Sequence, residues 1–167
     1  MAEVTPPKNG TILELGPGHD DQLEHYLNNG HNVIAVDYSP EVIKHLQKRL
    51  KRYIRKGKLT LIEGHYAEAL KTPAWKKEQV DHVIAIAATE SHLHTETLFK
   101  TIHGALKTGG TVTIMELTPI YTELVEYLQK AGLIVEKVKV KPYLHPNIRF
   151  TIPPVRDYYT IITSRKP

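Results

Sequence analysis

The 167-residue chain is organised around the stretch TILELGPGHDD at residues 11–21. An apolar run that carries a single acid, Glu14, predicts a buried strand. The run stops at Gly16-Pro17-Gly18, and the polar segment that follows predicts the start of a helix. Glycine-rich turns between a strand and a helix let the backbone approach a nucleotide-like ligand closely. The stretch therefore predicts a ligand site at the end of the first strand.

Strands and helices alternate along the rest of the chain. Apolar and β-branched runs predict strands, while capping residues and apolar steps of three and four predict helices. The expected strands cover residues 11–15, 31–37, 58–64, 81–88, 111–117, 133–140 and 157–164. The expected helices begin near residues 21, 40, 95 and 119. This order predicts an α/β fold of three layers: a seven-stranded, mostly parallel sheet with an antiparallel last strand and helices on both faces.

The composition is that of one globular domain. Hydrophobic residues make up 41% of the chain and charged residues 24%, which is ordinary for a folded domain of this length, so we expect a single domain over residues 1–167. The absence of cysteine excludes disulfides, thiolate metal sites and cysteine nucleophiles. No apolar run has the length of a signal-peptide core or a membrane span. The sequence therefore predicts a cytoplasmic protein with no membrane segment.

Much of the positive charge lies in residues 44–58, KHLQKRLKRYIRKGK, which contain no acid. Such a segment is typical either of a nucleic-acid-binding surface or of a solvated helix face. The spacing favours the solvated face and leaves nucleic acid as the alternative, because apolar residues recur on one side of the predicted helix. The expected buried stripe is Val42, Ile43, Leu46, Leu50 and Ile54, and the expected outward cations are Lys44, Lys48, Lys51, Arg52 and Arg55.

The turn after the first strand suits a cationic nucleoside better than a dinucleotide. A dinucleotide-binding turn has a third glycine that permits close helix–strand packing, and this sequence has His19-Asp20-Asp21 after Gly18. Acids at the start of a helix would also repel a pyrophosphate from its N-terminus. S-adenosylmethionine has no phosphate and carries a sulfonium and an ammonium, so its charge matches this turn.

Three motifs then follow in order. An acid-x-Gly-x-Gly motif is present at Glu14-Leu15-Gly16-Pro17-Gly18, an acid ends the second strand at Asp37, and a glycine pair precedes the fifth strand at Gly109-Gly110. In these motifs the chain resembles the class I S-adenosylmethionine-dependent methyltransferases over residues 11–117. The resemblance implies a Rossmann-like fold and S-adenosylmethionine as the cofactor.

The resemblance also implies which residues bind the cofactor. Asp37 would accept hydrogen bonds from both ribose hydroxyls. Glu14 would order the loop or reach the methionyl ammonium through water, unless it is a structural acid. The family commonly has glycine then aspartate after the third strand, and this chain has Gly64-His65-Tyr66. A neutral His65 ring nitrogen or backbone groups would then replace the adenine-binding acid, and Tyr66 would stack on adenine. The expected cofactor-binding residues are Glu14, Leu15, Gly16, Pro17, Gly18, Asp37, Tyr38, His65, Tyr66 and Ala87.

The segment after the fourth strand is expected to border the methyl acceptor. Methyl transfer depends mainly on alignment of the nucleophile with the S–CH3 bond, and a base helps only where the acceptor must lose a proton. Glu90 and His92 are the candidates for acceptor binding or catalysis, and the alternative is that both are surface residues. His92, His94 and Glu90 do not form a full set of metal ligands, so we expect no metal site.

The acceptor is not identified by the sequence. Because the first strand begins near residue 11, we expect a minimal domain without an N-terminal lid. An open site suits a large acceptor, such as protein or RNA, unless the connection at residues 141–156 or a second subunit of a homodimer covers it. The departures at Asp20 and His65 motivate an alternative function, a catalytically inactive methyltransferase-like domain that serves as a binding or scaffold module.

Overall fold

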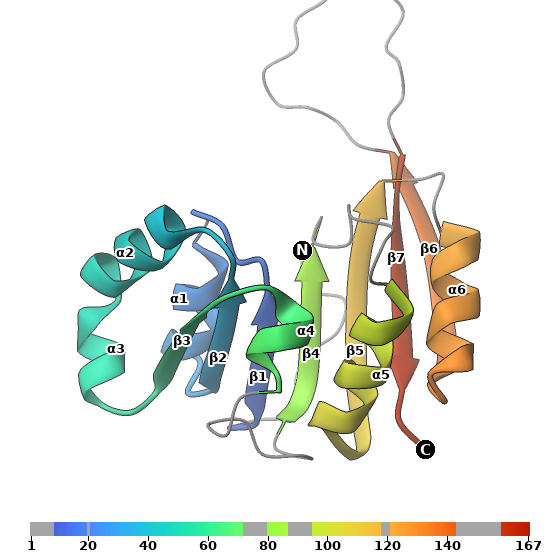
Figure 1. Cartoon of the computed structure of the whole chain (residues 1–167), viewed down its shortest axis with the longest axis horizontal. Coiled ribbons are helices and arrows are strands. Elements are labelled where there is room, and N and C mark those ends of the chain that lie inside the picture. The colour runs from blue at the N-terminus through green and yellow to red at the C-terminus, as the bar shows by residue number, and fades with distance from the viewer. Residues whose placement is uncertain (1–8, 20, 72–79, 87–94, 118–120, 143–157) are drawn as a thin grey trace, which may run out of the picture.

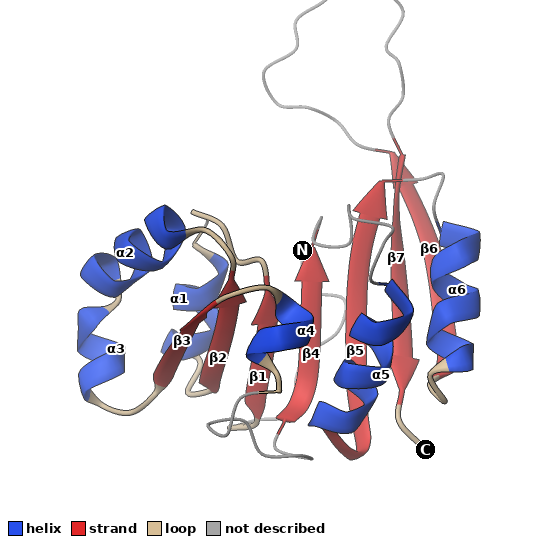
Figure 2. Cartoon of the chain, in the orientation of Figure 1, coloured by secondary structure: helices blue, strands red, loops and turns tan. Residues whose placement is uncertain are grey.

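The structure is a computed structural model that describes residues 9–19, 21–71, 80–86, 95–117, 121–142 and 158–167. Seven strands form one sheet with helices on both faces, which confirms the predicted three-layer α/β fold (Figures 1 and 2). The strands are β1 (Thr11–Leu15), β2 (Asn32–Asp37), β3 (Leu59–Glu63), β4 (Val80–Ile86), β5 (Leu106–Leu117), β6 (Ile134–Pro142) and β7 (Tyr158–Arg165). The helices are α1 (Gln22–Asn28), α2 (Pro40–Arg49), α3 (Lys51–Arg55), α4 (Tyr66–Ala69), α5 (Thr95–Ala105) and α6 (Tyr121–Lys130).

The strand order is β3-β2-β1-β4-β5-β7-β6. The first five strands pair in parallel, and β7 runs antiparallel to both β5 and β6, as predicted for the last strand. The chain moves outward from β1 to β3 and then returns to the other side of β1 as β4. In open α/β sheets this reversal leaves a crevice at the carboxyl ends of the central strands, where ligands bind. The fold therefore puts the glycine-rich turn after β1 at that crevice.

The two faces of the sheet carry separate hydrophobic cores. On one face α5 and α6 bury Phe99 and Leu128 against residues such as Leu13 of β1. On the other face α1, α2 and α3 cover β1 to β3, with Leu46 of α2 packed near Val33 of β2. Helices α2 and α3 lie at the β3 end of the sheet and α6 lies at the β6 end (Figure 1). Burial on both faces explains why the inner strands read as apolar runs in the sequence.

The basic segment folds as two helices and not as one. The helix breaks at Leu50, whose φ of −104° and ψ of 19° are not helical. Because the break changes the helical phase, Tyr53 is buried at 8% exposure while Ile54 is 36% exposed. The prediction that Ile54 continues the buried stripe was therefore wrong, although Val42, Ile43, Leu46 and Leu50 are buried as expected. The five cations predicted to face outward are all exposed.

The segment before the fifth strand also differs from the prediction. We expected a helix through Leu106 and a strand from residue 111, whereas α5 ends at Ala105 and β5 begins at Leu106. Leu106 pairs with Val80, and the register shifts before the next pair. A Cβ at Gly110 would lie 2.8 Å from the Lys107 carbonyl oxygen, so only glycine fits this irregular strand start. Pairing with β4 therefore extends β5 back into residues where the local sequence favours the end of a helix.

Two helix starts show how far capping rules hold. The Ser39 hydroxyl accepts a hydrogen bond from the Val42 backbone N–H at 3.4 Å, which confirms the predicted N-cap of α2. Asp21 precedes α1 but makes no side-chain capping bond. Its carboxylate instead pairs with Arg49 of α2 at 3.1 Å. Helix α4, which begins at Tyr66, was not expected from the sequence.

Comparing Leu46→Ala with Ile54→Ala tests the helix break. Leu46→Ala should lower the free energy of unfolding by about 2–5 kcal/mol because it leaves a cavity in the core. Ile54→Ala should change it by less than about 1 kcal/mol because the side chain is already exposed. Urea denaturation monitored by circular dichroism measures both values. Equal losses would show that α2 and α3 form one continuous amphipathic helix.

A histidine is buried within the sheet. His82 is fully buried on β4, with Nδ1 2.6 Å from the Thr111 hydroxyl and Nε2 3.3 Å from the Thr113 hydroxyl. Burial, with a smaller contribution from the neighbouring His31, lowers the pKa of His82 from 6.5 to about 4. The native state therefore holds the His82 ring neutral, whereas the unfolded chain protonates it near pH 6.5.

This difference predicts acid sensitivity. Because the folded-state pKa lies below the unfolded one, the unfolded chain binds more protons between pH 6.5 and about 4, and stability falls as the pH falls through that range. The loss assigned to His82 is about 3 kcal/mol, complete below pH 4. The pH dependence of urea unfolding should be shallower by this amount in His82→Gln than in wild type or in the exposed control His25→Gln. Parallel pH curves for wild type and His82→Gln would contradict the burial of a neutral ring.

Candidate functional site

The candidate site lies where β1, β2 and β3 end. After β1, the Gly16 backbone N–H donates to the Val36 carbonyl oxygen of β2 at 2.9 Å, which holds the turn beside the neighbouring strand. Gly16 and Gly18 have φ angles of 68° and 60°, a left-handed conformation that favours glycine. Pro17 between them is buried. The backbone path of the turn thus favours glycine at positions 16 and 18.

Asp37 joins the segments of the site. The residue is 5% exposed, and its carboxylate accepts hydrogen bonds from two backbone N–H groups, Ser39 to Oδ1 at 2.9 Å and Gly18 to Oδ2 at 3.4 Å. The Asp37 carbonyl oxygen also accepts from the Gly64 N–H at 2.9 Å, after β3. Because an ionised carboxylate has about four acceptor positions, these two bonds leave capacity for ligand hydroxyls.

The space in front of Gly18 is open. A Cβ built at Gly18 would meet no atom within 4 Å, so the backbone faces an unfilled space next to the Asp37 carboxylate. A ligand at this point would contact the peptide backbone directly and reach a buried acceptor for its hydroxyl groups. The arrangement fits a nucleoside whose ribose bonds to Asp37.

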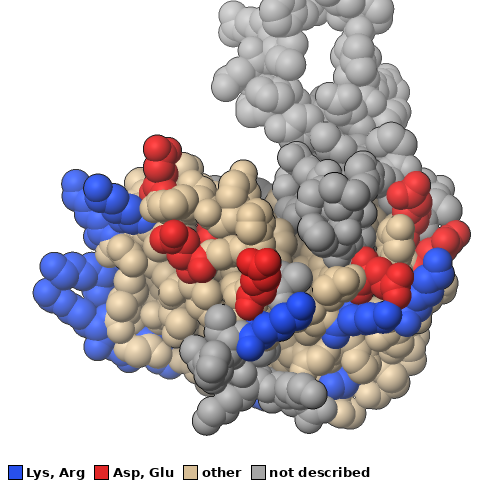
Figure 3. Space-filling model, viewed as in Figure 1, with Lys and Arg blue, Asp and Glu red and all other residues tan. Residues whose placement is uncertain are grey.

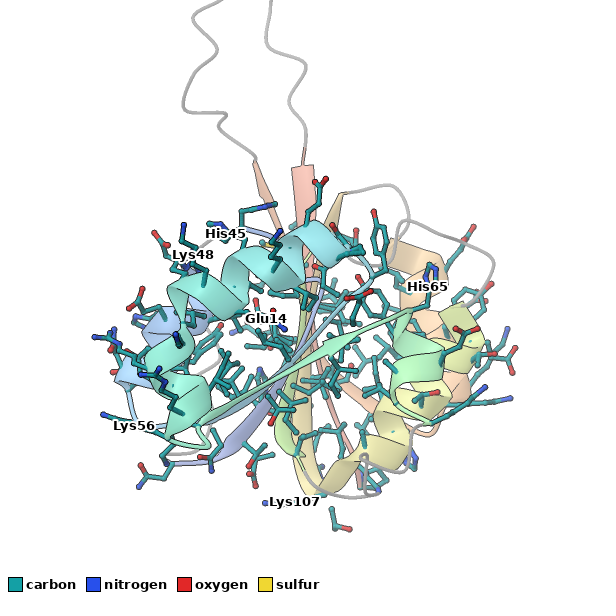
Figure 4. The ribbon with its side chains drawn as sticks, turned by 60° about the vertical axis from the view of Figure 1, so that its left-hand side comes forward. Glu14, His45, Lys48, Lys56, His65 and Lys107 are labelled. Carbon is teal, nitrogen blue, oxygen red and sulfur yellow. The ribbon has the colours of Figure 1, made fainter. Side chains whose placement is uncertain are left out.

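Two aromatic rings stack on each other at the ends of β2 and β3. Tyr38 follows Asp37 and is 63% exposed, and its ring is stacked on that of His65 with centroids 5.6 Å apart and planes 2° apart. His65 lies at the end of β3, before α4 (Figure 4). Tyr66 is half-buried and packs against the core under α5. The exposed aromatic surface at the ends of β2 and β3 therefore comes from Tyr38 and His65.

Glu14 and Leu15 occupy buried positions at the end of β1. Glu14 is 3% exposed and lies in the interior beneath α2 (Figure 4). Its neighbours in the sheet are Ala35 of β2 and Ile84 of β4. Leu15 is fully buried in the core, so only its backbone is available to a ligand. The acid of the motif thus stands inside the protein, behind the turn.

Helix α2 also contacts the segment that follows the glycine-rich turn after β1. The Arg49 guanidinium donates to the His19 carbonyl oxygen at 3.0 Å and pairs with the Asp21 carboxylate at 3.1 Å. The His45 ring lies 5.0 Å from the His19 ring. Arg49 was not predicted as a site residue, because no local spacing links it to a turn 30 residues earlier. Arg49 is a positioning residue for the turn.

Several predicted residues lie outside the described part of the chain. Asp20, Ala87, Glu90 and His92 belong to this group. Within the described residues, no group of three or more histidines and acids could hold a metal ion. The described helices also include none long and apolar enough to cross a membrane.

Comparison with known proteins identifies the family. Residues 13–114 match the family model described as "Methyltransferase domain", which covers more than half of the chain. The chain belongs to this family: it is an S-adenosylmethionine-dependent methyltransferase domain with a Rossmann-like fold. The motifs at Glu14–Gly18 and at Asp37 lie within the matched region.

A curated relative from Methanospirillum hungatei, named "Probable ribosomal RNA small subunit methyltransferase A", is 33% identical over 73 residues. That match covers 44% of this chain and spans only 27% of the relative. Among solved structures, the methyltransferase bound to the Haloferax volcanii Trm112 activator has a TM-score of 0.77 and 17% identity, covering 99% of this chain and 86% of that one. An S-adenosylmethionine-dependent methyltransferase from Listeria monocytogenes has a TM-score of 0.74 and 14% identity, with 96% and 92% covered. At these identities the two structures show a shared fold.

Gly18→Ala and Gly57→Ala form a matched pair that tests the open space. Both glycines have left-handed φ angles, 60° and 66°, and a Cβ at either would meet no atom within 4 Å. Each substitution should therefore cost about 1–2 kcal/mol of stability. Only Gly18→Ala should also weaken S-adenosylmethionine binding, about tenfold or about 1.4 kcal/mol, because its methyl group enters the ligand space. Calorimetric titration measures the affinity, and equal affinities in the two variants would place the ligand away from Gly18.

Proposed function

We propose that the intact protein binds S-adenosylmethionine in the crevice beyond β1 and β2 and transfers its methyl group to an acceptor. The single observation that supports this most is the Asp37 carboxylate, buried next to the open space at Gly18 and oriented by two backbone N–H groups. When bound, S-adenosylmethionine supplies a methyl group on a positively charged sulfur, which an acceptor nucleophile displaces directly.

The proposed roles of the residues follow from their positions. Asp37 would accept the ribose hydroxyls, and the backbone from Leu15 to Gly18 would lie against the methionyl part. Tyr38 and His65 would border the adenine, since both rings are exposed at the ends of β2 and β3. Glu14 would act from behind the turn by ordering it. The other cofactor contacts stay predictions from the sequence: the side chains of Pro17 and Tyr66, and Ala87.

The residues proposed to contact the methyl acceptor are predicted from the sequence. Glu90 and His92 follow β4, next to β1 in the sheet, and are proposed to bind the acceptor or to remove its proton. The proposed acceptor is a macromolecule, and the name of the Methanospirillum hungatei relative supports RNA. A cytoplasmic location and a homodimer stay predictions from the sequence.

Calorimetric titration with S-adenosylmethionine and with its demethylated product tests the proposal. Wild type should bind both compounds. Asp37→Ala should weaken binding by about 1.5–3 kcal/mol, because it removes the charged carboxylate that would accept hydrogen bonds from the ribose hydroxyls. Glu41→Ala is the matched control, an exposed acid in the first turn of α2. Asp37→Asn keeps the shape of the side chain and separates loss of charge from loss of fold.

Two results would contradict the proposal. Wild-type affinity in Asp37→Ala would show that the ribose is held elsewhere. Failure of the wild-type protein to bind either compound would favour the alternative function, an inactive methyltransferase-like scaffold.

A further inference from the structure

An open groove of about 800 Å³ runs along the β3 edge of the sheet, outside the cofactor crevice. Its walls carry the side chains of Lys44, Lys48, Lys51 and Arg55 from α2 and α3. Leu59 and Leu61 of β3 contribute apolar surface. We call this feature the basic groove. Lysines and arginines gather over α2 and α3 at the left of the molecule in Figure 3.

The cations of these helices form two sets with different surroundings. Arg49 and Arg52 turn toward α1, where they pair with the carboxylates of Asp21 and Glu24 at 3.1 and 2.8 Å. The four groove cations, two on α2 and two on α3, all line the same groove, and all four are exposed. Within the described part of the chain, none of these four makes an ion pair. The groove therefore carries uncompensated positive charge.

The other wall of the groove offers hydrogen-bond donors. Among the described residues, strand β3 ends the sheet and pairs only with β2, so its outward backbone N–H groups have no strand partner there. The exposed Thr60 side chain also lines the groove and carries a hydroxyl. Ammonium groups on one side and neutral donors on the other match an anionic ligand with many oxygen acceptors.

We propose that the basic groove docks the sugar–phosphate backbone of a nucleic acid. The stripe from Lys44 to Arg55 carries four cations, enough to contact several phosphates of one strand. No acid occurs from residue 44 to residue 62. Helix α2 begins three residues after Asp37, so a strand in the groove runs beside the helix that starts at the cofactor crevice. The inference concerns a separate surface and stands whether or not the crevice transfers methyl groups.

An acidic peptide paired with β3 fits the groove less well. An added strand directs alternate side chains to opposite faces of the sheet, so only half of its carboxylates would face the helices. The four cations all stand on α2 and α3, which cover one face of the sheet. Phosphates along one side of a nucleic-acid strand can all meet this stripe. Lysines near a sheet edge also discourage edge-to-edge aggregation, and this role requires no ligand.

Neutralising the groove, with a matched control, tests the proposal. The groove variant is K44Q/K48Q/K51Q/R55Q, and the control K71Q/K100Q/K130Q/K137Q removes four exposed lysines elsewhere. Each variant lowers the formal net charge from +4 to 0. Fluorescence anisotropy with a labelled mixed-sequence RNA oligonucleotide, repeated with DNA of the same sequence, measures binding over a range of salt concentrations.

The groove variant should bind the RNA or the DNA at least about tenfold more weakly than wild type, and its log K against log salt slope should be smaller by up to about 3. The control should keep nearly wild-type values. S-adenosylmethionine affinity should not change in the groove variant, which separates this surface from the crevice. Where circular dichroism shows that the quadruple variant is unfolded, K44Q/K51Q and K48Q/R55Q replace it.

Three outcomes would overturn the proposal. Wild type that binds neither nucleic acid would leave edge protection as the role of the lysines. Equal losses of nucleic-acid affinity in the groove variant and the control would show that the effect comes from net charge alone. Polyglutamate that binds wild type more tightly than RNA, and loses affinity in the groove variant, would assign the groove to an acidic polypeptide.

Discussion

The carboxylate of Asp37 is the point on which the ligand end of this molecule depends. It accepts hydrogen bonds from the backbone N–H groups of Ser39 and Gly18, so one side chain connects the end of β2, the start of α2 and the turn after β1. The backbone carbonyl oxygen of Asp37 also accepts a hydrogen bond from the Gly64 N–H, which connects the segment after β3 to the same point. A buried carboxylate needs such partners, because an unsatisfied charge inside a protein is costly. The need to satisfy this carboxylate orders three segments, and it also leaves a hydrogen-bond acceptor facing the open space at Gly18.

Helix α2 serves three surfaces at once. Leu46 points into the core, Arg49 holds the turn through His19 and Asp21, and Lys44 and Lys48 stand on the basic groove. A single helix can do this because side chains three and four residues apart share a face while intermediate ones point elsewhere. The ion pair with Asp21 is itself weak, since that carboxylate is almost fully exposed. Its value is positional: it keeps the glycine turn against a helix whose inner face is fixed by packing.

Much of the candidate site was predictable from the sequence, because its residues stand at the ends of strands. Parallel strands align their carboxyl ends, so Gly18 and Asp37 were expected to meet once both strands had been recognised. Arg49 was not predicted, since its contact with the turn depends on how α2 crosses the sheet. The pairing of the Tyr38 and His65 rings has the same origin, because it depends on the register between β2 and β3. Local sequence carries no signal for such distances.

The family motifs were recognised by their resemblance to known methyltransferases. The order of strands and helices and the parallel sheet follow from periodicity and from residue types that act locally, such as glycine in a left-handed turn or serine at a helix start. These preferences operate between neighbours in the chain, which is why one sequence was sufficient for them. Two features depend on contacts with distant strands: Tyr53, after the break at Leu50, is buried in place of Ile54, and β5 begins early at Leu106, which pairs with β4. In each case the free energy of burying or pairing a residue outweighed the weaker local tendency to continue a helix.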